Sequence, residues 1–141
     1  MKKKLLFLCT GNSCRSQIAE GFAKKYLNDL KIDSAGTKPE SINPYAIETM
    51  KEIGIDISDQ FSKKINNDEL KNYNLIITLC GDAKDKCRIL NTSNHIHWGI
   101  PDPAKVIADK KETLYEFSKV RDSILRNIKL LKEELKINMR K

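Results

Sequence analysis

Short apolar runs alternate along this chain with longer stretches in which apolar residues recur every three or four positions. The runs from Lys3 to Cys9 and from Asn74 to Leu79 are brief, hydrophobic and bounded by turn residues, so they predict buried strands. Shorter runs predict two further strands, at Ile32 to Ser34 and around Ile96 to Trp98.

Helical spacing of apolar residues predicts three main helices. The first runs from Arg15 to about Leu27, and the second begins at Pro44 and ends near Gly54. A shorter capped helix is predicted at Asn67 to Leu70. A long basic helix ends the chain, and its apolar stripe consists of Phe117, Val120, Ile124, Ile128, Leu131 and Leu135.

The alternation of strands and helices predicts an α/β fold, a small parallel sheet with helices on both faces. No repeat, low-complexity tract or linker interrupts residues 1–141, so we expect a single domain. Ligands of such sheets bind beyond the carboxyl ends of the strands. Cys9, Cys80 and Asp102 each follow a predicted strand, and we therefore expect them to meet in one crevice.

The composition, with 40% hydrophobic and 32% charged residues, is typical of a soluble globular domain. The apolar run from Leu5 to Leu8 is shorter than the roughly 7–15 residues of a signal peptide core, and no run approaches the roughly 18 residues of a membrane helix. We therefore expect a cytoplasmic protein without a membrane partner. Most of the net charge of +7 lies from Lys110 onward, on the long helix, which favours a solvated helix face over nucleic-acid binding.

The segment from Cys9 to Ser16 joins a predicted strand to a predicted helix. Backbone N–H groups in such a turn and at the helix N-terminus favour a tetrahedral oxyanion, and the planar guanidinium of Arg15 suits the same ligand. We expect the same field to lower the pKa of the Cys9 thiol below roughly 8.5, which would make it a nucleophilic thiolate. The residues expected to contact the anion are Thr10, Gly11, Asn12, Ser13, Cys14, Arg15 and Ser16.

A cysteine and an arginine at this spacing also have a plainer interpretation. In it the cysteine is a small buried strand residue, and the arginine is a surface residue at a helix start. The position of Cys9 and Arg15 at a strand-to-helix junction that contains Gly11 favours the anion site over that interpretation. For Cys14, packing in the core and a chemical role at the site agree equally well with the sequence. The segment is not a Walker A nucleotide loop, because the Gly-Lys-Ser/Thr ending is absent.

Cys80 and Cys87 lie seven positions apart across a polar segment. Structural zinc sites usually take cysteines separated by about two to four residues, a spacing that this pair lacks and that Cys9 and Cys14 barely reach. We therefore expect no metal, although a zinc-stabilised binding module is the non-enzymatic alternative. A disulfide between Cys80 and Cys87 in a cytoplasmic protein would be transient and catalytic, whereas either cysteine alone also fits an unreactive residue.

Four segments of the chain together resemble thioredoxin-coupled arsenate reductases on the low-molecular-weight protein tyrosine phosphatase fold. They are CTGNSCRSQIAEG from Cys9, DSAG from Asp33, TLCGDAKDKC from Thr78 and HWGIPDPA from His97. The resemblance covers about residues 3 to 135. The loop with its arginine and the Asp-Pro pair are shared with the phosphatases, whereas the two later cysteines in their TLC…C context are specific to the reductases.

The resemblance implies a mechanism without a cofactor. Arsenate would bind between Cys9 and Ser16 and be attacked by Cys9, while Asp102 protonates the departing oxygen. Cys80 would then attack Cys9 and release arsenite, and Cys87 would attack Cys80, leaving a disulfide for thioredoxin. Reduction of As(V) to As(III) takes two electrons, which explains the need for further thiols. Nothing in the sequence requires more than a monomer.

A phosphatase acting on phosphotyrosine or small phosphomonoesters is the main alternative, because it needs Cys9, Arg15 and Asp102 but not the later cysteines. The resemblance argues against phosphotyrosine, since Ala104 and Lys105 stand where the phosphatases usually place aromatic residues.

Some members of the family that the chain resembles bind potassium through an asparagine, a glutamate, a serine and an aspartate. Asn12, Glu20 and Ser34 match the first three of these residues, but Lys63 stands at the position of the aspartate. The ammonium group of Lys63 could replace the ion. We therefore expect no potassium requirement.

Overall fold

Four parallel strands form the central sheet of the computed structural model, which describes residues 2–80, 94–105 and 108–139. The strands are β1 (Lys4–Cys9), β2 (Lys31–Gly36), β3 (Leu75–Thr78) and β4 (His95–His97), in the order β2-β1-β3-β4. Every pairing between neighbours is parallel, so all carboxyl ends lie at the same edge.

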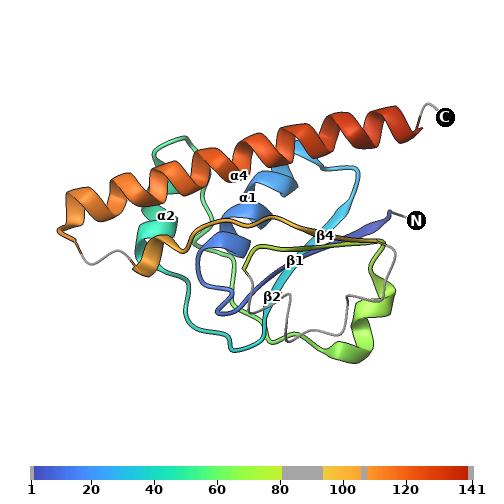
Figure 1. Ribbon diagram of the computed structural model, residues 1–141, viewed down its shortest axis with the longest axis horizontal. Coiled ribbons are helices and arrows are strands. Elements are labelled where there is room, and N and C mark those ends of the chain that lie inside the picture. The colour runs from blue at the N-terminus through green and yellow to red at the C-terminus, as the bar shows by residue number, and fades with distance from the viewer. Residues whose placement is uncertain (1, 81–93, 106–107, 140–141) are drawn as a thin grey trace.

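Three α-helices cover one face of this sheet (Figure 1): α1 (Arg15–Tyr26), α2 (Pro44–Lys51) and the long α4 (Lys110–Met139). A 3-10 helix, η1 (Asn67–Asn72), lies against the other face, and a second, η3 (Pro103–Lys105), follows β4. The predicted α/β class is confirmed. Among the described residues, the second face is covered by 3-10 helix and irregular chain, not by α-helix.

Strand β1 is buried on both faces, as expected for the inner strands of a parallel sheet. Its alternating side chains divide between two hydrophobic clusters: Leu5 and Phe7 pack with the α-helices, and Leu6 and Leu8 pack toward η1. The predicted stripe of α4 faces the first cluster, with five of its residues buried and Leu135 partly buried. Burial of this stripe fixes α4 against α1 and α2.

Several element boundaries differ from the prediction by a few residues. Strand β2 continues to Gly36, because Gly36 pairs with Cys9 at the end of β1. Helix α2 ends at Lys51, and a turn with Gly54 at φ 81° closes it, with Ile55 N donating to Met50 O at 3.0 Å. Across the described ranges, no helix combines the length and the apolar character that a bilayer crossing needs.

Candidate active site

Three segments converge at the carboxyl edge of the sheet. Cys9 is the last residue of β1, Cys80 follows β3 by two residues, and Asp102 lies in the loop after β4. The side chains of Cys9 and Cys80 are in hydrogen-bonding contact, and Arg15 Nη2 lies 3.8 Å from Asp102 Oδ2. The expected meeting of these residues in one place is confirmed.

The loop from Cys9 to Ser16 is shaped by Asn12, which is completely buried and has a φ of 48°. A non-glycine residue rarely adopts this left-handed conformation, so its contacts must hold it there. Its Nδ2 donates to Ser16 Oγ at 2.7 Å and to Ser34 Oγ at 2.9 Å, and its Oδ1 accepts from Lys63 N at 2.9 Å. Asn12 thus connects the loop to α1, β2 and the segment before η1.

Three carbonyl groups of the loop are bound by the segment that follows β2. Thr10 O, Gly11 O and Ser13 O accept hydrogen bonds from the backbone N–H groups of residues 38, 40 and 43, each at 2.8 Å. The C=O and N–H of one trans peptide point in opposite directions. The N–H groups of Gly11, Asn12 and Cys14 therefore point away from that segment, which is the orientation that an anion-binding loop needs.

Arg15 is buried to 8% exposure at the first position of α1. Its Nη1 donates to Ile100 O at 2.8 Å, while its buried Nε has no hydrogen-bond partner among the described residues. Burial lowers the pKa of the guanidinium, but the neighbouring Cys9 and Asp102 outweigh it and the pKa is raised. The side chain is a fixed cation with an unused donor, as an oxyanion site requires.

The thiol of Cys80 lies against the start of the same loop, 3.0 Å from Thr10 Oγ1. Its hydrogen bond with Cys9 raises the pKa of the Cys9 thiol, burial raises it further, and Arg15 opposes both. The sequence-based expectation of a lowered pKa is therefore wrong for this arrangement. That expectation considered the loop and Arg15 but not a second buried thiol, which makes loss of a proton from Cys9 costlier.

Asp102 is held in place by the loop itself and by Cys14. Its Oδ1 accepts from Ala104 N at 3.0 Å and lies 4.0 Å from the Cys14 thiol. Burial raises the pKa of Cys14, and the charge of Asp102 raises it further, so this thiol stays protonated. Cys14 also packs in the hydrophobic core, which supports the packing interpretation of this residue.

Low molecular weight phosphotyrosine protein phosphatases match residues 4–141 of the chain. The chain belongs to this family. It is 51% identical over 136 residues to the arsenate reductase of Shouchella clausii (strain KSM-K16), covering 94% of this chain and 96% of that protein. It is 50% identical over 134 residues to the arsenate reductase of Bacillus subtilis (strain 168), covering 92% and 95% respectively.

Solved structures of the family share the fold. A structure described as an arsenate reductase in the phosphate binding state superposes with a TM-score of 0.72 at 32% identity, over 94% of this chain and 98% of that one. The tyrosine phosphatase Wzb from Escherichia coli K30, in complex with sulphate, superposes with a TM-score of 0.82 at 22% identity, over 96% and 99%. The second similarity concerns the fold alone.

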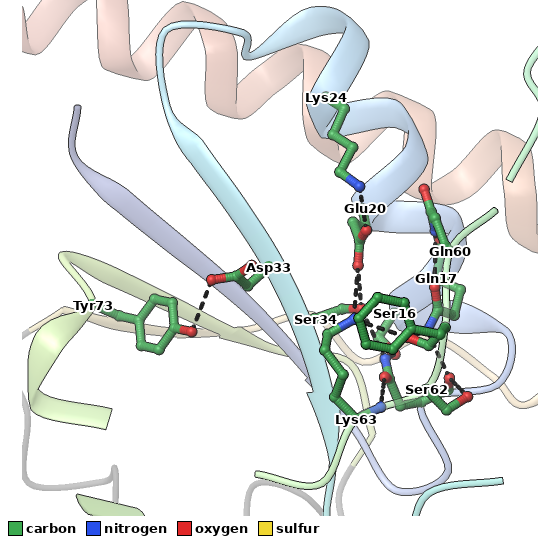
Figure 2. A network of polar contacts seen from close by, with 12 residues as sticks. Ser16, Gln17, Glu20, Lys24, Asp33, Ser34, Gln60, Ser62, Lys63 and Tyr73 are labelled. Carbon is green, nitrogen blue, oxygen red and sulfur yellow. Dashed lines mark hydrogen bonds and ion pairs between the residues drawn. The ribbon is translucent and has the colours of Figure 1, made fainter. Parts of the chain in front are cut away.

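Within this phosphatase family fold, several polar residues that support the loop could not be identified from the sequence. Gln17 Nε2 donates to Asn12 O at 2.9 Å, and Ser62 Oγ donates to the same oxygen at 2.8 Å. Gln60 Nε2 in turn donates to Gln17 Oε1 at 2.8 Å. Figure 2 shows these side chains gathered beside α1. Gln17 is fully buried, which the sequence does not reveal, and nothing in the sequence marks Ser62 or Gln60.

Metal binding finds no support in the described ranges, where no group of three or more His, Cys, Asp or Glu side chains could hold an ion. His95 Nε2 and His97 Nδ1 both contact Thr78 Oγ1, at 2.9 and 2.8 Å. Cys87 and the rest of residues 81–93 lie outside the described residues. The described residues therefore present a strand-to-helix loop with one thiol at its base and a second thiol in contact with the first.

Proposed function

We propose that this protein is an arsenate reductase that passes two electrons from thioredoxin to arsenate through Cys9, Cys80 and Cys87. The observation that carries the proposal is the contact of Cys80 with both Cys9 and Thr10. A phosphatase has no use for a second thiol against its nucleophile. The relatives at about 50% identity that are named arsenate reductase support the same reaction.

In the first step arsenate occupies the loop, bound by its inward N–H groups and by Arg15. Cys9 loses its proton and forms a sulfur–arsenic bond as one arsenic–oxygen bond breaks. The oxygen leaves as water with a proton from Asp102, and the proton given up by the thiol makes good the one that Asp102 supplies. The ion pair between Arg15 and Asp102 supports these two roles, because it places the anion clamp and the acid side by side.

In the second step the Cys80 thiolate attacks the sulfur of Cys9. A disulfide forms between them, and the electron pair of the broken sulfur–arsenic bond remains on arsenic, which leaves as arsenite, As(III). Cys87 then attacks Cys80, releasing the Cys9 thiolate and forming a Cys80–Cys87 disulfide, which thioredoxin reduces. Regeneration by thioredoxin would require a cytoplasmic location, where thiols are kept reduced, and the proposed relay needs no more than a monomer.

The experiment is arsenate-dependent NADPH oxidation with thioredoxin and thioredoxin reductase. Cys80→Ser should release no arsenite, even in a single turnover. Cys87→Ser should release about one arsenite per protein and then stop, because the oxidised pair cannot reach thioredoxin. Full multiple-turnover activity in both variants would overturn the relay.

A phosphatase is the second candidate, favoured by the match to the phosphotyrosine phosphatase description and by the Arg15–Asp102 pair. Ala104, which follows Pro103, is exposed and offers no aromatic surface for phosphotyrosine. Hydrolysis of p-nitrophenyl phosphate separates the two candidates. A phosphatase would keep this activity in Cys80→Ser and Cys87→Ser and would show no arsenate-dependent oxidation in the wild type.

A further inference from the structure

Gln17 on α1 binds a carbonyl group in the middle of the loop from Cys9 to Ser16. Its side chain is completely buried, and its Nε2 donates to Asn12 O at 2.9 Å and to Phe61 O at 3.1 Å. Both acceptors are carbonyl oxygens, so only the NH2 group of the carboxamide can face them. The two N–H groups of the Gln17 side chain are therefore both used, and one of them binds the loop.

A second glutamine fixes this carboxamide. Gln60 Nε2 donates to Gln17 Oε1 at 2.8 Å and to Gln17 O at 3.0 Å, so it binds the side chain and the backbone of one residue. Figure 2 shows the two glutamine side chains against each other beside α1, with Ser62 below them. Ser62 Oγ also lies 2.8 Å from Asn12 O, but its single proton is shared with Glu40 O. Gln17 is thus the donor that Asn12 O keeps in either orientation of that hydroxyl.

The bond from Gln17 orients the peptide that joins Asn12 to Ser13. The C=O and N–H of a trans peptide point in opposite directions, so a carbonyl directed at Gln17 turns the N–H of Ser13 away from that side chain. The carbonyl groups of residues 10, 11 and 13 are bound by the segment after β2. The N–H groups of residues 11 to 14 therefore all point away from the chain that binds the carbonyl groups of the loop.

The same bond strengthens the Ser13 N–H as a donor. A carbonyl group that accepts a hydrogen bond polarises its peptide, and hydrogen bonds in a buried chain reinforce one another. Gln60, Gln17 and the peptide from Asn12 to Ser13 form such a chain, with the Ser13 N–H at its end. Loss of the Gln17 bond would therefore both release this N–H and weaken it.

We propose that Gln17 is a positioning residue for arsenate, which directs and polarises the Ser13 N–H so that this group donates to the bound oxyanion. This role rests on the proposed function, the binding of arsenate in the loop. Asn12 has a φ of 48°, a conformation that persists only while its contacts hold it, and the Gln17 bond fixes the peptide that follows it. The Ser13 N–H is then in place before the anion arrives.

Gln17→Met tests the proposal, because methionine has a similar length and cannot donate. Calorimetric titration with inorganic phosphate measures the affinity, and NMR of nitrogen-15-labelled protein follows each loop amide separately. In the wild type, phosphate should move the Ser13 amide proton downfield together with that of Gly11. We expect Gln17→Met to bind phosphate roughly five-fold more weakly and to raise the arsenate KM by a similar factor, with a smaller change in kcat. The shift of Ser13 should be largely lost, whereas that of Gly11 should remain.

Thr49→Val is the matched control, since it also replaces a buried polar side chain of a helix by an apolar one. The hydroxyl of Thr49 accepts from Arg121 Nη1 on α4 at 3.2 Å, so this variant should lose stability but bind phosphate like the wild type. Gln60→Met releases the Gln17 carboxamide at a half-buried position and should weaken phosphate binding roughly two-fold with a smaller Ser13 shift. That variant decides the matter if Gln17→Met does not fold.

Two results would overturn the proposed role of Gln17. One is a Ser13 amide that phosphate moves equally in the wild type and in Gln17→Met, or that it leaves unmoved in the wild type while Gly11 responds. The other is a loss of phosphate affinity in Thr49→Val as large as that in Gln17→Met. A wild type in which phosphate moves no loop amide and arsenate is not reduced would instead refute the proposed function, so the two failures are distinguishable.

Discussion

Thr10 Oγ1 lies 3.0 Å from Cys80 Sγ, although 70 residues separate them in the sequence. Thr10 belongs to the loop proposed to bind the anion, and Cys80 follows the neighbouring strand β3. One side chain therefore connects the proposed first step, in which the loop receives arsenate, with the second, in which Cys80 attacks.

Thr10→Val removes the hydroxyl that contacts Cys80 and keeps the shape of the side chain. A neutral hydrogen bond is worth about 1 kcal/mol, so we expect arsenite release in a single turnover to slow roughly five-fold. Phosphate affinity should hardly change, because the backbone of Thr10 still binds Lys38 N through its carbonyl. Rapid-quench measurement of arsenite checks this, and Thr10→Ser is the control. A loss of phosphate affinity without slower release would contradict it.

Cys80→Ala should lower the pKa of Cys9, because the hydrogen bond to Cys80 is the largest cause of its elevation and Arg15 would remain to oppose burial. Iodoacetamide reacts only with the thiolate, so the alkylation rate of Cys9 should rise at a pH about one unit or more lower than in the wild type. Peptide mass spectrometry separates Cys9 from Cys14. An unchanged profile would show that Cys80 does not control the proton of Cys9.

The raised pKa of Cys9 also predicts that the folded protein loses stability at high pH. The ordinary pKa of a cysteine thiol is 9.0. At a pH above this value the unfolded chain loses the Cys9 proton, whereas the folded wild type keeps it. The free energy of unfolding should therefore fall as pH rises above about 9, and Cys80→Ala should reduce this fall. Urea denaturation between about pH 8 and about pH 10 measures both slopes.

Arg15→Lys keeps the charge and removes the planar fork together with the donor to Ile100 O. Hydrogen bonds to charged groups are worth about 1.5–3 kcal/mol, so phosphate affinity should fall roughly 10- to 100-fold. Calorimetric titration checks the result. Arg126→Lys on the exposed face of α4 is the matched control and should bind phosphate like the wild type. If Arg15→Lys bound phosphate with the wild-type affinity, Arg15 would be excluded from the anion site.

Gly36→Ala should displace the loop, because an added Cβ would lie 2.6 Å from Thr10 O and 2.9 Å from Asn12 N. Both are backbone atoms that cannot rotate away, so we expect a loss of about 1–3 kcal/mol in stability together with weaker phosphate binding. Gly99→Ala, whose nearest contact would be His97 Nε2 at 3.9 Å, is the control. Denaturation and titration of both variants measure the difference. Wild-type behaviour of Gly36→Ala would show that the loop tolerates the extra atom.

Local signals were sufficient for most of the fold. The run at 74–79, the helical spacing from Arg15 and the stop at Gly54 depend on neighbours in the chain, and the structure has those elements within a few residues. The boundary of β2 was missed because Gly36 is strand only through its pairing with Cys9. On the second face the short helix predicted from Asn67 is present as η1, two residues longer than expected, because its end follows tertiary packing more than periodicity.

The sequence by itself determined the α/β class, the loop between Cys9 and Arg15, and the arrival of Cys9, Cys80 and Asp102 at one edge of a parallel sheet. The alternation of strands and helices indicates a parallel sheet, and parallel strands bring their carboxyl ends together. Only the tertiary structure decided the pKa of Cys9, the partners of Asn12 and the pairing of Lys63 with Glu20. Those depend on distances of a few ångströms between residues far apart in the chain, where burial and charge act, and no local pattern encodes them.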